Sequence, residues 1–152
     1  MVYPVLSDEN FMNEALKEAQ KAMDLEEVPV GAVVVNQNRI IARAHNQTQQ
    51  LNDVTAHAEM IAITSAANFL GAKYLVDCTM FVTLEPCVMC AEALKWAQID
   101  RLVLAAPDPK EGFSRLQEPI LHKKTMVVPG ILEKEASLLL KQFFLLRRNQ
   151  KN

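Results

Sequence analysis

Two short motifs, about thirty residues apart, limit the folds open to this chain more than any other feature. His57-Ala-Glu59 and Pro86-Cys87-Val-Met-Cys90 each stand where a helix is predicted to begin, and the second follows a short apolar, β-branched run at 79–84. One imidazole and two thiolates are ligands that suit zinc, and the Cys-x-x-Cys spacing lets both sulfurs reach one ion from a single helical turn. We therefore expect a fold in which two helix N-termini supply ligands to one metal ion.

The rest of the chain alternates strands with helices. Apolar residues recur at spacings of three and four from Glu9 to Leu25, which predicts a helix capped by Ser7 or Asp8. Two β-rich runs, one on each side of Asn36-Gln-Asn38, predict a hairpin. The other predicted elements are helices at 56–70, 88–97 and 131–148, the last with Leu and Phe on its buried side, and strands at 79–84, 101–106 and 125–128. This order predicts an α/β sandwich with helices on both faces of one sheet, in a single domain spanning residues 1–152.

Composition and charge exclude several classes of protein. Half of the 152 residues are hydrophobic and 22% are charged, which excludes a disordered or low-complexity chain. No apolar run approaches the roughly 18 residues that span a bilayer, and the N-terminus lacks a secretory signal, so we expect a cytoplasmic protein with no membrane partner. The net charge of -2 argues against a protein that coats nucleic acid. Residues 141–152 nevertheless carry four basic residues and no acidic one, which is enough to steer a single phosphate-bearing loop.

The ligand set points to catalysis rather than to a structural clip. Three protein ligands, His57, Cys87 and Cys90, leave one position of tetrahedral zinc open to water, and no Cys or His with a paired spacing closes the site. Glu59 lies two residues after His57, about 200° around an ideal helix, so it is placed for proton transfer rather than as a second ligand. We assign Glu59 as the proton shuttle.

The motifs and several flanking segments resemble the bacterial tRNA-specific adenosine deaminases, in the cytidine-deaminase-like zinc deaminase superfamily. The segments that carry the resemblance are 28–33, His45-Asn46, 55–60, 82–91, Asp108-x-Lys110-x-Gly112, Gly130-Ile-Leu and Phe143-Phe144 with a basic end. The resemblance implies a three-layer α/β/α sandwich with a mixed five-stranded sheet and a basic C-terminal helix at about 131–149. It also implies a homodimer and a tRNA anticodon stem-loop as partner.

By resemblance, the reaction makes inosine from adenosine at the wobble position of the anticodon. One zinc ion per subunit, held by His57, Cys87 and Cys90, would activate water for attack on C6 of the adenine, and Glu59 would move the protons. The residues that the resemblance places at the substrate are Asn46, Val30, Leu84, Glu85, Asp108 and Lys110, with RNA contacts from Arg147, Arg148 and Lys151.

Each substrate contact has a plainer alternative. Val30 also fits as an ordinary strand residue, Asn46 as a turn former, the 108–110 segment as a solvated loop, and the terminal basic residues as a solvated helix end. Prolines flank Asp108, and Gln47 stands where many members carry Arg. Two other functions stay open: a zinc deaminase of a free base or nucleoside, of guanine or cytosine type, and a zinc module that binds nucleic acid without catalysis. Glu59 argues against the last, because a module without activity does not need a carboxylate beside an open metal position.

Overall fold

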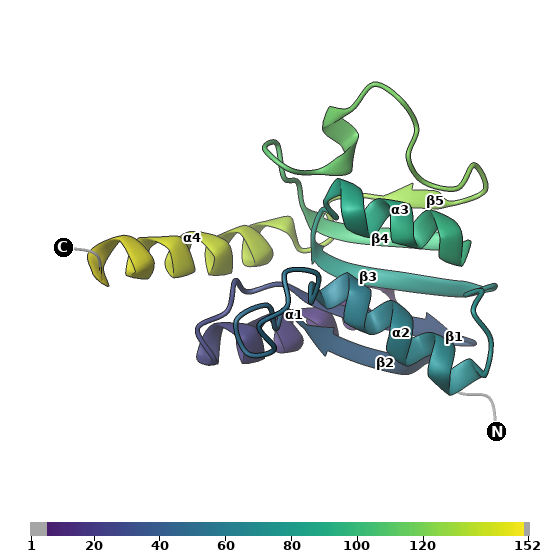
Figure 1. Cartoon of the computed structure of the whole chain (residues 1–152), viewed down its shortest axis with the longest axis horizontal. Coiled ribbons are helices and arrows are strands. Elements are labelled where there is room, and N and C mark those ends of the chain that lie inside the picture. Colours follow the sequence, from purple (N-terminus) through teal and green to yellow (C-terminus); the bar gives the residue numbers. More distant parts are fainter. Residues whose placement is uncertain (1–5, 151–152) are drawn as a thin grey trace.

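A mixed sheet of five strands lies at the centre of the molecule, between two layers of helices (Figure 1). The structure is a computed structural model, and it describes residues 6–150. The strands are β1 (Gly31–Asn36), β2 (Arg39–His45), β3 (Cys78–Leu84), β4 (Arg101–Ala106) and β5 (Met126–Val128), in the spatial order β2-β1-β3-β4-β5. The helices are α1 (Asp8–Asp24), α2 (Ala58–Leu70), α3 (Val88–Ala97) and α4 (Glu133–Gln150). The predicted three-layer sandwich is confirmed.

Side-chain alternation along β1 divides the core between the two layers. Ala32 and Val34 face α2 and α3, while Val33 and Val35 face α1 and α4. Gly31 allows α1 to lie close against the sheet, because a Cβ at this position would overlap the backbone of the helix at Ala15 and Ala19. The sheet is therefore covered on both faces, and its strands are accordingly rich in apolar residues.

The strand directions determine where a site can form. β1 runs antiparallel to both β2 and β3, and β3, β4 and β5 are parallel, so four strands point the same way. The segments that follow β2, β3 and β4 therefore leave the sheet at a single edge. Loops at the carboxyl edge of parallel strands are the usual place for ligand sites in α/β proteins.

Most predicted boundaries agree with the structure to within two residues. Ser7 caps α1 through a reciprocal capping box with Asn10, and Gly71 ends α2 in the left-handed conformation. Helix α2 begins at Ala58 rather than at residue 56, because Thr55 instead takes part in a turn closed by the Asp53 carboxylate. No helix within residues 6–150 is long and apolar enough to cross a membrane.

The terminal helix differs from its prediction in what it buries. α4 begins at Glu133, two residues later than predicted, after Leu132 at a positive φ. Ala136 and Phe143 are buried along it and Leu140 packs against the core beside α1, whereas four large apolar side chains are half exposed: Leu138, Phe144, Leu145 and Leu146. The prediction of Leu and Phe on a buried side thus holds for Leu140 and Phe143 and is wrong for these four residues. Figure 1 shows the cause, because the second half of α4 extends past the sheet that it would cover.

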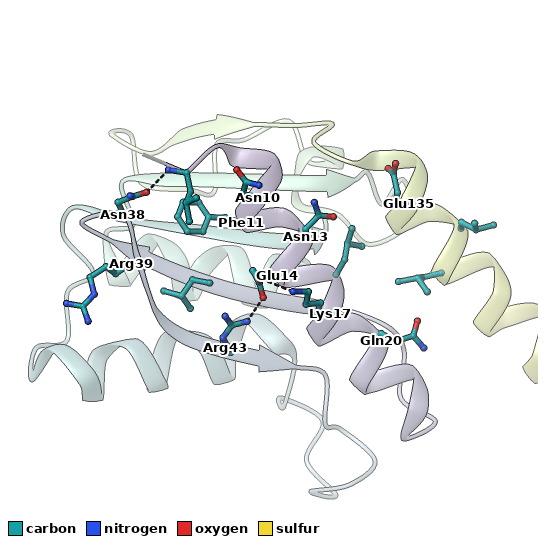
Figure 2. Close-up of a pocket in the computed structure, with 15 residues that line it drawn as sticks. Asn10, Phe11, Asn13, Glu14, Lys17, Gln20, Asn38, Arg39, Arg43 and Glu135 are labelled. Atoms are coloured by element: carbon teal, nitrogen blue, oxygen red, sulfur yellow. Dashed lines mark hydrogen bonds and ion pairs between the residues drawn. The ribbon is translucent and has the colours of Figure 1, made fainter. Parts of the chain in front are cut away.

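A groove of about 1080 Å³ lies between α1, β2 and α4, in the layer opposite α2 and α3 (Figure 2). Its wall carries an ion-pair chain in which Glu14 meets Arg43 at 2.9 Å and Lys17 at 3.0 Å. None of the residues that the sequence predicts for the site lines this groove.

Candidate active site

The two sequence motifs meet at the N-termini of α2 and α3. His57 is the N-cap residue of α2 and Cys87 that of α3, both with extended backbone and neither with a side-chain capping hydrogen bond. Pro86 precedes the N-cap instead of occupying the first helical position. It still stands between the end of β3 and the start of α3, where a proline interrupts regular structure. Because the caps are not made by these side chains, the imidazole and the thiol can turn toward each other.

The three predicted ligands form one compact cluster. Nδ1 of His57 lies 3.6 Å from Sγ of Cys87 and 3.5 Å from Sγ of Cys90, and the three ligand atoms all lie within 4.8 Å of one another. Zinc bonded tetrahedrally to one imidazole nitrogen and one thiolate holds these atoms about 3.6 Å apart. Both the donor atoms and their spacing therefore fit a zinc ion.

Proton sharing within the cluster also suits a metal. The hydrogen bond from Cys90, and after it the bond from His57, lowers the pKa of the Cys87 thiol to about 4. The same partnership with Cys87, together with burial, raises the pKa of Cys90, and the hydrogen bond to Cys87 raises the pKa of His57. A lowered pKa favours the thiolate form of Cys87, which is the form that binds a metal, and a bound ion would displace the protons of Cys90 and His57.

Glu59 stands beside this cluster in the first turn of α2. Its side chain is buried, with only 4% of the residue exposed, and this burial raises the pKa of its carboxyl above the ordinary range. A carboxyl with a raised pKa exchanges a proton near neutral pH more readily than an exposed one. Glu59 therefore has the location and the electrostatic environment that proton transfer requires.

Asn46 lies at the same edge, directly after β2. Its backbone N–H donates to the carbonyl of Val30 at 3.0 Å, which joins these two predicted substrate residues. Both are more than nine-tenths buried, and the Oδ1 atom of Asn46 has no hydrogen-bond partner within the described chain. A buried amide oxygen without a donor costs free energy, so a ligand that brings a donor would be favoured here.

The third wall of the site is the loop after β4. Leu84, the last residue of β3, lies opposite Ala106, the last residue of β4, and Asp108 comes two residues after Ala106. The Asp108 carboxylate accepts the N–H groups of Lys110 and Glu111 at 3.1 and 3.2 Å, so it closes its own turn while Lys110 stays exposed. Gly112 pairs with Cys87 in an isolated antiparallel bridge, which places this loop against a predicted metal ligand.

The basic end of α4 is partly occupied within the chain. Arg147 donates to the carbonyl of Glu26 at 3.2 Å and lies over the Phe143 ring, 5.2 Å from its centroid. Arg148 is exposed, and Lys151 lies outside the described residues. Arg147 therefore attaches α4 to the turn after α1, a role that the sequence did not indicate.

Sequence reasoning also missed a buried acid, Glu27. Its carboxylate accepts the N–H groups of Gln49 and Gln50 at about 3.0 Å and the hydroxyl of Thr48 at 3.3 Å. This loop links Asn46 to His57, so Glu27 holds the connection between two candidate site residues. Nothing in the local pattern around residue 27 distinguishes it from the exposed Glu26 beside it.

Comparisons with known proteins agree with this geometry. Residues 6–106 match the family model of the cytidine and deoxycytidylate deaminase zinc-binding region. The chain is 44% identical over 149 residues to the tRNA-specific adenosine deaminase of Aquifex aeolicus, covering 95% of this chain and 98% of the relative. It is also 44% identical to the Bacillus subtilis protein of the same name, covering 95% and 92%.

Two solved structures have folds similar to that of this chain. One comes from work on A-to-I editing by tRNA:A34 deaminases at the wobble position of transfer RNA; it is 44% identical, with a TM-score of 0.82, over 86% of this chain and 99% of that one. A guanine deaminase from Bacillus subtilis is 38% identical, with a TM-score of 0.65, over 67% and 66%. The similarity is therefore more extensive on the side of the tRNA deaminases.

Proposed function

The chain belongs to the tRNA-specific adenosine deaminases, within the cytidine and deoxycytidylate deaminase zinc-binding family, and we propose that it deaminates adenosine to inosine at the wobble position of a tRNA anticodon. The observation that carries the proposal is the cluster of His57, Cys87 and Cys90 beside the buried carboxyl of Glu59. The reaction consumes water and releases ammonia, so it needs an activated nucleophile and a group that carries protons.

The cofactor of this family is zinc, and Nδ1 of His57 with the sulfurs of Cys87 and Cys90 would hold one ion per subunit. When bound, zinc supplies the Lewis acidity that makes water a nucleophile near neutral pH. Glu59 would take a proton from the attacking water and deliver protons to the purine ring nitrogen and to the departing amino group. Its burial supports this role, since water does not compete for the proton.

The substrate would be oriented by the residues around the cluster. Oδ1 of Asn46 is a buried acceptor that would meet a donor of the target nucleotide, and the buried Val30 beside it would line the base pocket. Leu84 and the backbone at Glu85 would border the pocket next to the metal ligands, while Asp108 and Lys110 would face the neighbouring nucleotides. Because the wobble base is unpaired in an anticodon loop, the enzyme need not melt a duplex to bring it into the pocket.

The RNA partner that this function requires is an anticodon stem-loop, and we propose that basic residues at the end of the chain contact its phosphates. Arg148 and Lys151 are the stronger candidates, because Arg147 is engaged by Glu26 and Phe143. Phosphate contacts of this kind position an RNA and make its binding weaken with salt. A salt dependence of KM that is unchanged in Arg148→Gln would contradict this contact.

We further propose a cytoplasmic homodimer in which residues 1–152 form one deaminase domain. Two large aromatic side chains are available for such a contact, since Trp96 on α3 is 73% exposed and Phe69 on α2 is 66% exposed. Both lie in the α2–α3 layer that carries the site, so a second copy of the chain is the partner that would cover them. Light scattering of the full chain measures the dimer directly, and a monomeric mass would contradict it.

One comparison of substrates tests the function. The zinc-loaded chain is incubated with an anticodon stem-loop that carries adenosine at the wobble position, and separately with free adenosine, guanine and cytosine. We expect inosine from the stem-loop, detected by nucleoside mass spectrometry. Turnover of the free compounds alone would overturn the proposal in favour of a free-base or nucleoside deaminase.

A variant then tests the proton shuttle. Glu59→Gln keeps the size of the side chain and should keep the zinc, yet it should lower kcat by about 10²- to 10⁴-fold. Glu9→Gln is the matched control, because it makes the same chemical change in the first turn of α1 at an exposed position. Full activity of Glu59→Gln would show that another group moves the protons.

A further inference from the structure

A second buried carboxylate, Glu85, connects the metal-ligand segment to the loop after β4. Glu85 is only 6% exposed, and its Oε1 accepts the N–H of Asp108 at 3.2 Å. Its Oε2 accepts both the N–H of Ser114 at 2.9 Å and the Ser114 hydroxyl at 2.7 Å. Both oxygens are therefore engaged by a single loop, whose two ends they hold.

Glu85 itself belongs to the metal-ligand segment. Its backbone N–H donates to the carbonyl of Ala106 at 2.8 Å, and Cys87 follows two residues later. The next residue, Pro86, accepts the N–H of Phe113 at 3.0 Å, and Gly112 pairs with Cys87. The loop and the ligand segment thus run side by side, with the Glu85 carboxylate between them.

The loop is shaped to receive this carboxylate. A Cβ at Gly112 would overlap the carboxylate of Glu85, although the φ of -64° at Gly112 is one that any residue adopts. Glycine is required here by the close approach and not by the backbone angle. Pro107, Pro109 and Lys110 are exposed, so apolar packing contributes little to holding this part of the loop.

We propose that Glu85 is a positioning residue, which fixes the 108–114 loop to the metal-ligand segment so that the nucleotide-facing wall and the metal site form one rigid unit. This inference rests on the proposed function for the identity of the substrate. The Glu85 carboxylate already accepts three hydrogen bonds from the chain. It therefore acts on substrate binding by holding the loop, and its side chain does not contact the substrate. A rigid wall lowers the ordering cost of binding, so its effect falls on KM more than on kcat.

Two variants test the proposal by different physical routes. Glu85→Gln keeps the volume but places an NH₂ group against at least one of the N–H donors, while Gly112→Ala keeps the carboxylate and fills the space that it occupies. In each, we expect KM for the stem-loop to rise about tenfold or more, with kcat within about threefold and the zinc content unchanged. Glu111→Gln is the matched control, because it removes a charge from the same loop at an exposed side chain.

Amide hydrogen exchange measures the loop without any substrate. In Glu85→Gln the amides of Asp108 and Ser114 should exchange about tenfold faster or more, while Glu111→Gln leaves them unchanged. Unchanged exchange at these amides would overturn the proposal. So would a parallel fall of kcat and zinc content at constant KM, which is the signature of a merely destabilised fold.

The same data separate this proposal from the proposed function. A wild-type chain that does not deaminate the stem-loop contradicts the proposed function. Faster exchange at the Asp108 and Ser114 amides in Glu85→Gln would still support Glu85 as the positioning residue, because that measurement needs no substrate.

Discussion

Replacing Gly31 with alanine should separate α1 from the sheet. The new Cβ would overlap the backbone oxygen of Ala15 and the backbone nitrogen of Ala19, and it would lie 2.8 Å from the Cβ of Glu18. Ordinary contacts of this kind begin at 3.4 Å, and two of the three atoms belong to a helix backbone that cannot turn aside. The whole helix must therefore move away from the sheet by about 1 Å. A gap of that size removes about a quarter to a half of the van der Waals attraction of each contact across it.

The cost follows from what α1 buries. Phe11, Met12, Ala15 and other residues of the helix pack against the sheet, so the retreat loosens a continuous part of the core. Overpacking lowers the free energy of unfolding by about 1–3 kcal/mol. Because the overlapped atoms belong to a rigid backbone, we expect Gly31→Ala to lose about 3 kcal/mol. For a chain of this length that corresponds to a fall in Tm of about 6–12 °C.

Thermal and urea unfolding of the wild type and Gly31→Ala measure this loss, with m unchanged if only the native state is affected. Gly71→Ala is the control, because its Cβ meets nothing within 4 Å and only the φ of +66° opposes it. That variant should lose about 1 kcal/mol. A Tm of Gly31→Ala within about 2 °C of the wild type would refute the close-approach argument.

Three further outcomes follow from individual side chains. Asn46→Ala should raise KM for the stem-loop about tenfold while changing the unfolding free energy by less than about 1 kcal/mol, because Oδ1 has no partner within residues 6–150 to lose; equal losses of stability and binding would contradict this. In zinc-free protein at pH 6, iodoacetamide should alkylate Cys87 quickly, because the pKa of its thiol is lowered to about 4. Cys78 should stay unmodified, because burial raises the pKa of its thiol. Mass spectrometry of the labelled peptides measures both, and zinc should protect Cys87. Hydrogen bonds from Arg43 and Lys17 lower the pKa of Glu14, so its contribution is present above the unfolded value of 4.5 and lost as pH falls through the folded value. Urea unfolding of Glu14→Gln should therefore show a loss of at most about 1 kcal/mol at pH 7 that becomes smaller as the pH is lowered below 4.5, and a loss that does not change with pH would contradict the assignment.

The sequence by itself determined the features that depend on neighbouring residues. Helix periodicity, the cap at Ser7 and the stop at Gly71 are local, so their positions were predictable to within two residues. The metal cluster was also predictable, because the chemistry of three ligands restricts both residue type and spacing. The two motifs identify the zinc deaminase family, whose fold then follows for the whole chain.

Only the tertiary structure decided which polar groups are occupied and which are free. Glu85 bonds to residues 23 and 29 positions away, and Arg147 bonds to a carbonyl 121 positions away, so no local pattern indicates either role. The amphipathic pattern of α4 predicted a buried side, but the sheet ends before the helix does, and Leu138, Leu145 and Leu146 stay half exposed. Burial is a property of the packed molecule, which is why residue type revealed the chemistry of this site and the fold alone revealed what holds its walls in place.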